Sequence, residues 1–198
     1  MIRKIFVMAS LGLYLAANHA LAQTTTENAP VTDCDTYGAN SVDPQRKTPG
    51  VNFVELNAAV ALPACEAAAQ QYPDSTRFMY QLGRAYHKAN RFADAAAWYQ
   101  KAMEHSSAFA EAGLALLYLY GQGMTQDYSK AATMFRDAAD KGVLGAQNVM
   151  GILYSNGWGV PQDEAQALVW YRKAADQGVN AAKKLLGDLE TKRKAQTK

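Results

Sequence analysis

The amino-acid sequence predicts an all-α fold, an α-solenoid of helix-turn-helix repeats preceded by an irregular segment. Three observations lead to this prediction. First, residues recur at a fixed spacing: Tyr118 and Gly121 return as Tyr154 and Gly157, each 36 positions later. Repeats of this length are typical of stacked supersecondary units that share one core. Second, small and aromatic residues recur at helical spacing within each unit, and third, Gly, Pro and Asp mark the turns between helices.

Residues 1–22 have the pattern of an export signal. Arg3 and Lys4 precede an apolar run, and Ala20-Leu21-Ala22 then gives a small-x-small cleavage pattern. We expect cleavage after Ala22 and a mature protein that is periplasmic or secreted. A membrane span is the weaker interpretation, because the apolar run is shorter than the roughly 20 residues that a bilayer crossing needs.

The charge of the mature chain argues against nucleic acid. Without the two cations of the signal, the 20 Lys and Arg become 18, which balance 18 Asp and Glu. A nucleic-acid partner would call for a strong cationic excess, so we expect none, and no stable membrane span after cleavage.

Cys34 and Cys65 are the two cysteines of the chain. In an exported protein they are expected to form a disulfide, with two free thiols as the alternative. The disulfide would pin the leader, residues 23–52, which carries several prolines and little apolar periodicity.

The helical part begins with an expected N-terminal helix in residues 53–75, capped by Asn57. Because proline is tolerated best in the first turn, the regular helix should begin close to Leu62 or kink at Pro63. Two-helix units are expected over three ranges, followed by a capping helix with a basic tail: 76–109, 110–145, 146–181 and 182–198. The polar face of that last helix is typical of a terminal unit, so we expect the chain to be complete there.

Paired glycines separate the two helices of each of the last two units, Gly121 and Gly123 in one and Gly157 and Gly159 in the other. Such glycines supply positive φ after a helix end, and the aspartate four positions further on is expected to cap the next helix. A Gly-x-Gly turn without a third glycine or a preceding strand does not indicate a phosphate site.

The repeated positions read Leu or Met, a small residue, Tyr, Gly-x-Gly, Asp, Ala, an aromatic residue, Ala-Ala and Gly. With this signature, residues 110–145 and 146–181 resemble Sel1-like repeats, and residues 76–109 resemble a tetratricopeptide repeat. The resemblance implies a right-handed superhelix that scaffolds protein-protein contacts, in bacteria often within the envelope, without naming a partner. Some cysteine-rich relatives have been assigned penicillin-binding or β-lactamase activity, but the repeats here contain no cysteine, so that activity is not carried over.

The sequence gives no sign of catalysis, of a metal site or of a cofactor. His87 and His105 are far apart on different expected helices, without Cys or carboxylate at metal-ligand spacing. No nucleophile motif appears either. We therefore expect a protein that is not an enzyme.

In this superfamily the first helices of successive units line a concave groove. On the first unit this face is a cationic strip with one aromatic residue, which would suit an acidic peptide, or else is a solvated face paired with nearby acids. The strip comprises Arg77, Tyr80, Arg84, His87 and Lys88.

The later units carry the other candidate contacts. The second unit offers a more apolar face with Leu116 and Tyr120, and the third a polar face with Asn148 and Asn156. The apolar residues are either exposed to a partner or covered by a neighbouring helix. Trp158, between two loop glycines, is either an exposed binding residue or a packing residue.

These observations favour an exported adaptor that binds a peptide or protein segment in its concave groove, and the cationic strip would suit an acidic segment. The alternatives are a periplasmic inhibitor of a membrane sensor and a secreted host-interaction factor, with a cell-wall hydrolase last. The oligomeric state stays open.

Overall fold

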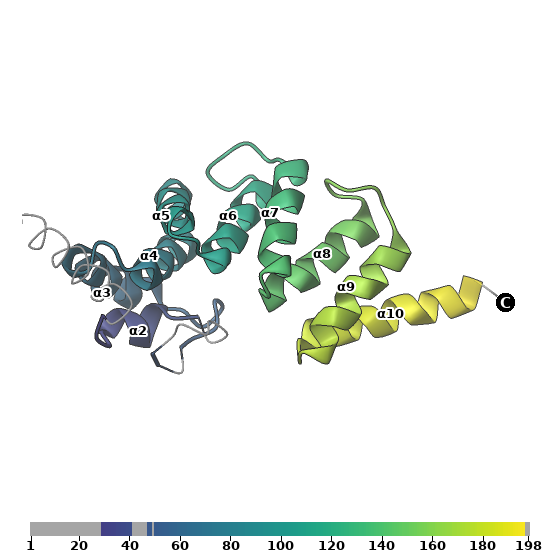
Figure 1. Cartoon of the computed structure of the whole chain (residues 1–198), viewed down its shortest axis with the longest axis horizontal. Helices are drawn as coiled ribbons and strands as arrows, with labels where there is room; N and C mark the ends of the chain where they lie inside the picture. The colour runs from purple at the N-terminus through teal and green to yellow at the C-terminus, as the bar shows by residue number, and fades with distance from the viewer. Residues whose placement is uncertain (1–28, 41–46, 49, 197–198) are drawn as a thin grey trace, which may run out of the picture.

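The computed structural model describes residues 29–40, 47–48 and 50–196. In this part of the chain nine helices follow one another, with one isolated β-bridge between Asn40 and Val51 and no strand. Figure 1 shows the helices stacked in sequence order along the long axis of the molecule, which confirms the predicted α-solenoid. The helices are α2 (Asp33–Gly38), α3 (Ala58–Gln71), α4 (Thr76–Lys88), α5 (Phe92–Glu104), α6 (Ala108–Tyr120), α7 (Tyr128–Asp140), α8 (Leu144–Asn156), α9 (Glu164–Asp176) and α10 (Asn180–Gln196).

The two-helix units are α4 with α5, α6 with α7, and α8 with α9. Their turns form as predicted: Gly121 and Gly157 end α6 and α8 in the left-handed conformation, with φ of 64° and 70°. Asp127 and Asp163 then accept backbone hydrogen bonds in the first turns of α7 and α9. These caps satisfy N–H groups that an isolated helix end would leave without partners.

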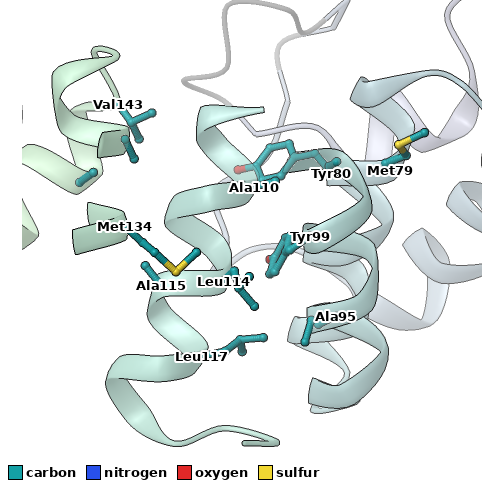
Figure 2. Packing of buried hydrophobic residues seen from close by; sticks show 14 of the residues in the cluster. Met79, Tyr80, Ala95, Tyr99, Ala110, Leu114, Ala115, Leu117, Met134 and Val143 are labelled. Carbon is teal, nitrogen blue, oxygen red and sulfur yellow. The ribbon is translucent and has the colours of Figure 1, made fainter. Parts of the chain in front are cut away.

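Tyr99 of α5 occupies the centre of the first unit and is 2% exposed. A Cβ atom added to Gly83 of α4 would lie 2.6 Å from its Cδ1, and one added to Gly113 of α6 would lie 2.7 Å from its Cζ. In Figure 2 the Tyr99 ring projects toward Leu114 of α6. Three helices therefore meet around one ring, at a distance that only glycine permits on two of them.

The same contact recurs in the third unit, where a Cβ atom on Gly151 of α8 would overlap the ring of Tyr171. Ala115 and Phe135 stand at the matching positions of the second unit, and both are buried. The aromatic residues Tyr99, Phe135 and Tyr171, which recur every 36 positions, are thus part of the core.

The N-terminal part differs from the prediction in two respects. The leader is not wholly irregular, because α2 forms within it. In addition, α3 begins at Ala58 and contains Pro63 in its interior, so the expected start near Leu62 is wrong. Asn57 does cap α3, accepting a hydrogen bond from the Ala59 N–H at 3.1 Å.

The predicted disulfide between Cys34 and Cys65 is present and joins α2 to α3. Both cysteines are fully buried. A Cβ atom on Gly38, in the last position of α2, would lie 2.6 Å from Cys65 Sγ, so the small residue lets α2 lie directly on α3.

The expected export signal, residues 1–22, lies outside the described residues. None of the helices in the described part of the chain is long and apolar enough to span a membrane.

Replacing Gly113 by Ala should destabilise the protein by roughly 1 to 3 kcal/mol, because the new methyl group would overlap the tightly packed Tyr99 ring. Urea unfolding followed by circular dichroism measures this change. Gly145→Ala is the matched control, since Gly145 is also helical and a Cβ atom there meets nothing within 4 Å. It should stabilise by up to about 1 kcal/mol; equal effects of both substitutions would contradict the packing role of Gly113.

Candidate functional site

Each first helix carries four residues spaced by three, four and four positions, which places them on one face. We call each set a groove stripe. The positions correspond between units, 32 residues apart from α4 to α6 and 36 apart from α6 to α8. The stripes are Arg77, Tyr80, Arg84 and Lys88 on α4; Phe109, Ala112, Leu116 and Tyr120 on α6; and Gly145, Asn148, Ile152 and Asn156 on α8.

The α4 stripe is covered by the chain's own N-terminal segment, by which we mean the described residues between 29 and 56. The cations of the stripe donate to backbone carbonyls of this segment. Arg77 bonds the carbonyls of residues 29 and 30, Arg84 bonds those of residues 38 and 51, and Lys88 bonds that of residue 54, at 2.7 to 3.2 Å. Asn40 of the segment donates to the hydroxyl of Tyr80 at 2.9 Å. Figure 1 shows α2 lying beside α4.

Asp35 is the charged centre of this contact and is fully buried. Its carboxylate pairs with Arg77 at 3.1 Å and accepts hydrogen bonds from Gln81 at 3.1 Å and from the Thr32 N–H at 2.9 Å. A buried carboxylate is costly unless it is paired and hydrogen-bonded, and here it is both. The N-terminal segment is therefore bound to α4 by a specific polar network in addition to the disulfide.

This arrangement corrects the prediction that the cationic strip is open to a partner. Arg77, Tyr80, Arg84 and His87 are all less than 9% exposed, and Lys88 is half-buried. The alternative of a solvated face is also wrong, because the N-terminal segment occupies that face.

His87 lies at the edge of the covered face. Its Nε2 is 3.0 Å from Gln122 Oε1, and its ring packs against Phe53 with centroids 5.0 Å apart. Burial lowers the pKa of His87 below its ordinary value, which the hydrogen bond to Gln122 only partly offsets. The ring is thus neutral near pH 7 and acts as a packed link between α4 and the loop after α6.

The α6 stripe adjoins the α4 stripe. Within the described residues, the N-terminal segment does not extend over it. Phe109 contacts Tyr80, with ring centroids 5.8 Å apart, so the stripe begins where the N-terminal segment ends. Phe109 and Leu116 are half-buried, and Tyr120 is 61% exposed. The stripe is apolar, as predicted, with exposure greatest at its C-terminal end.

The α8 stripe is polar. Asn156 is exposed and donates to the carbonyl of Ile152 at 2.8 Å, which occupies its amide within the helix. Asn148 is half-buried, and its Oδ1 is a buried acceptor without a hydrogen-bond partner among the described residues. An unpaired amide oxygen of this kind is unfavourable until a donor reaches it.

Trp158 packs on a neighbouring aromatic side chain and also keeps part of its surface exposed, so its role in binding stays a prediction. Its ring stacks on Tyr128 at the start of α7, with centroids 5.6 Å apart and planes 15° apart, and 37% of the residue stays exposed. Trp158 lies on the loop between α8 and α9, whereas the groove stripes lie on the first helices α4, α6 and α8. The structure thus groups Leu116, Tyr120, Asn148 and Asn156 on first helices and leaves Trp158 apart.

Sequence reasoning missed Asp35 and Gln81, which bind the N-terminal segment to α4. One signal could have found Asp35: it is adjacent to Cys34, whose predicted disulfide brings it to the helices. In the described ranges no three His, Cys, Asp or Glu side chains gather as metal ligands would. What the geometry offers is a row of helix faces, of which the first, on α4, binds a segment of the chain itself.

The stacked helix pairs define a repeat protein of the α-solenoid class. The Sel1 repeat model matches residues 108–143 and 145–179, and a tetratricopeptide repeat model matches residues 57–120. The chain belongs to the Sel1 repeat family. Repeats of this type are typically scaffolds for protein-protein interaction.

Solved structures agree with this assignment. The Sel1 repeat protein of Oxalobacter formigenes is 31% identical, with a TM-score of 0.54, over 64% of this chain and 97% of that one. A protective antigen of uropathogenic Escherichia coli with an SLR fold is 26% identical, with a TM-score of 0.60, over 74% of this chain but 31% of its own. Cysteine rich protein B of Helicobacter pylori shares the fold, at 21% identity and a TM-score of 0.50, over 62% of this chain and 94% of its own. No curated protein matches the chain.

Replacing both Cys34 and Cys65 by Ser should loosen the N-terminal segment and α3 while the later units keep their protection. The disulfide closes a loop with a sequence separation of 31, and opening such a loop costs about 3 to 4 kcal/mol in the chain-entropy description. Amide hydrogen exchange measured by mass spectrometry follows each segment separately. Equal acceleration in α6 to α9 would show that the segment is not a separable unit.

Proposed function

We propose that this protein is an exported, non-enzymatic scaffold that binds a segment of a partner protein along the groove stripes of α6 and α8. One observation carries the proposal. The corresponding stripe of α4 already binds a chain segment, the described part of the N-terminal segment, through each of its four side chains. The faces of α6 and α8 are the continuation of a surface that demonstrably accommodates non-helical backbone.

The chemistry of the two later stripes indicates what the partner segment looks like. The cations that would have attracted an acidic peptide are committed to backbone carbonyls and to Asp35. The α6 stripe offers Leu116 and Tyr120, and the α8 stripe offers the half-buried Asn148 and the exposed Asn156. A segment with apolar and uncharged polar side chains fits this surface better than an acidic one.

Export is the second part of the proposal. It rests on the signal pattern of residues 1–22 and on the disulfide, because disulfides persist chiefly in oxidising compartments. A periplasmic location follows if the mature protein stays within the envelope.

Replacing Tyr120 by Ser should weaken capture of the partner by roughly three- to thirtyfold, the range for loss of an aromatic anchor. The measurement is photo-crosslinking from position 116 in the cells of origin, followed by titration of the identified partner. Tyr37→Ser is the matched control, since Tyr37 is 40% exposed on α2, outside the groove stripes.

Because the stripe is apolar, binding should change little between low and high salt. Equal capture by the Tyr120 and Tyr37 variants, or a steep loss of binding with salt, would contradict a site on α6.

The mature chain should begin at Gln23 and sit outside the cytoplasm. Mass spectrometry of the intact protein from fractionated cells gives both the N-terminus and the compartment. Lys4→Glu with Arg3→Glu should block processing, because a signal needs its cationic start. An unprocessed chain in the cytoplasmic fraction of wild-type cells would sink the proposal of export and leave the groove site untouched.

A further inference from the structure

A hollow of about 260 Å³ lies between α3, α4 and α5. Three residues of α3, two of α4 and one of α5 line it: Glu66, Ala69, Gln70, Leu82, Tyr86 and Trp98. They supply one carboxylate, one amide and two aromatic rings, and the apolar atoms among them form the floor. Leu82 and Tyr86 are each two positions from Arg84, about 200° around the helix. The hollow is therefore on the side of α4 that faces away from the N-terminal segment.

Glu66 sets the charge of the hollow. Its Oε1 accepts a hydrogen bond from the Tyr86 hydroxyl at 2.6 Å, and burial together with this bond raises the pKa of Tyr86 to about 12. The phenol thus keeps its proton near pH 7 and donates a hydrogen bond to Glu66. Neither oxygen of Glu66 forms an ion pair within the described residues; the nearby Arg91 pairs with Asp94 at 2.7 Å instead.

The later units have a tyrosine at the same position of the repeat, and there the hydroxyl has a different partner. Tyr118 and Tyr154 occupy the place of Tyr86, 32 and 68 positions later. Lys130 lies 4.2 Å from the centre of the Tyr118 ring and donates to its hydroxyl at 2.7 Å. Arg136 does the same at Tyr154, with its guanidinium 5.6 Å from the ring centre. In both units a cation of the chain bonds the tyrosine hydroxyl.

At Tyr86 the hydroxyl bonds a carboxylate instead of a cation. Arg91 lies 4.5 Å over the Tyr86 ring, as the cations of the sister units lie over theirs, and Lys101 lies 5.0 Å from the Trp98 ring. Neither Arg91 nor Lys101 forms an ion pair with Glu66 within the described residues. The first unit therefore keeps a carboxylate without an ion-pair partner beside two aromatic rings, and its tyrosine hydroxyl bonds that carboxylate where the sister hydroxyls bond a cation.

We infer that this hollow binds an alkylammonium group, with the ammonium on the Glu66 carboxylate and the alkyl stem between Trp98 and Leu82. Carboxylates and aromatic rings both attract such cations, and the apolar floor accommodates methylene groups. The volume is just below the range of drug-sized pockets, so it suits a single side chain or a small amine. A lysine of a partner protein and a free diamine share this chemistry. The site is independent of the groove stripes.

The test follows the indole N–H resonances of the intact mature protein by NMR during titration. The probes are n-butylammonium chloride, neutral n-butanol, cadaverine and a blocked Ala-Lys-Ala peptide. We expect the ammonium probes to shift the Trp98 resonance and n-butanol to leave it in place. Trp170 is the internal control: like Trp98 it has a lysine three positions later, Lys173 at 4.9 Å, but it does not line the hollow.

Glu66→Gln keeps the size of the side chain and an acceptor for Tyr86, and it should weaken n-butylammonium binding roughly five- to tenfold. Glu104→Gln, at the end of α5, is the control and should leave it unchanged. Binding of the lysine peptide would indicate a protein partner, and binding of cadaverine without the peptide would indicate a free amine. Equal shifts of Trp98 and Trp170, equal binding of n-butanol, or full binding by the Glu66→Gln variant would overturn the inference.

Discussion

The contact of an aromatic ring with a glycine sets the distance between helices in the first and third units of this solenoid. Tyr99 meets Gly83 within its own unit and Gly113 in the next, so one ring fixes both the pairing of two helices and the stacking of two units. Dense packing of this kind leaves little freedom to shift one helix along another. The groove stripes of α4 and α6 keep a common register because Tyr99 holds both helices.

The N-terminal segment gives the first unit a different character from the others. Its contacts with Arg77 and Arg84 go mainly to backbone carbonyls, which any sequence could provide, whereas Asp35 and the disulfide fix which segment binds and in what position. The backbone carbonyls thus provide contacts that do not depend on sequence, and Asp35 and the disulfide provide those that do. On α6 and α8 no such segment lies on the stripes among the described residues, so in the proposed scaffold the partner would supply it.

The repeats were predictable because their determinants are local. Asp127 accepts a hydrogen bond from the N–H of Lys130, three positions later, and Gly121 turns the chain next to the helix it ends, so periodicity and turn chemistry were enough. The covering of α4 was not predictable in this way. Arg77 and Asp35 are 42 positions apart, and donation to carbonyls leaves no pattern in the sequence. For the same reason, the residues of the cationic strip indicated its charge correctly but did not indicate that the N-terminal segment lies on it. The interior position of Pro63 also escaped prediction, because neighbouring helices can support a helix that local propensity disfavours.

The uneven covering of the first helices has a mechanical consequence. A solenoid deforms by small rotations between neighbouring units, and each rotation must move the faces that link them. At the α4 end, the disulfide, the ion pair of Asp35 and the links from His87 to Gln122 oppose such rotation. At α8 and α10 the links within the described residues are helix contacts, the partly exposed ion pairs of Arg172 with Glu190 and of Lys192 with Glu164, and hydrogen bonds such as that from Arg136 to Tyr154. The covalent bond and the buried ion pair are thus concentrated at the N-terminal end, so we expect a segment bound along α6 and α8 to lie on the part of the molecule that bends more easily.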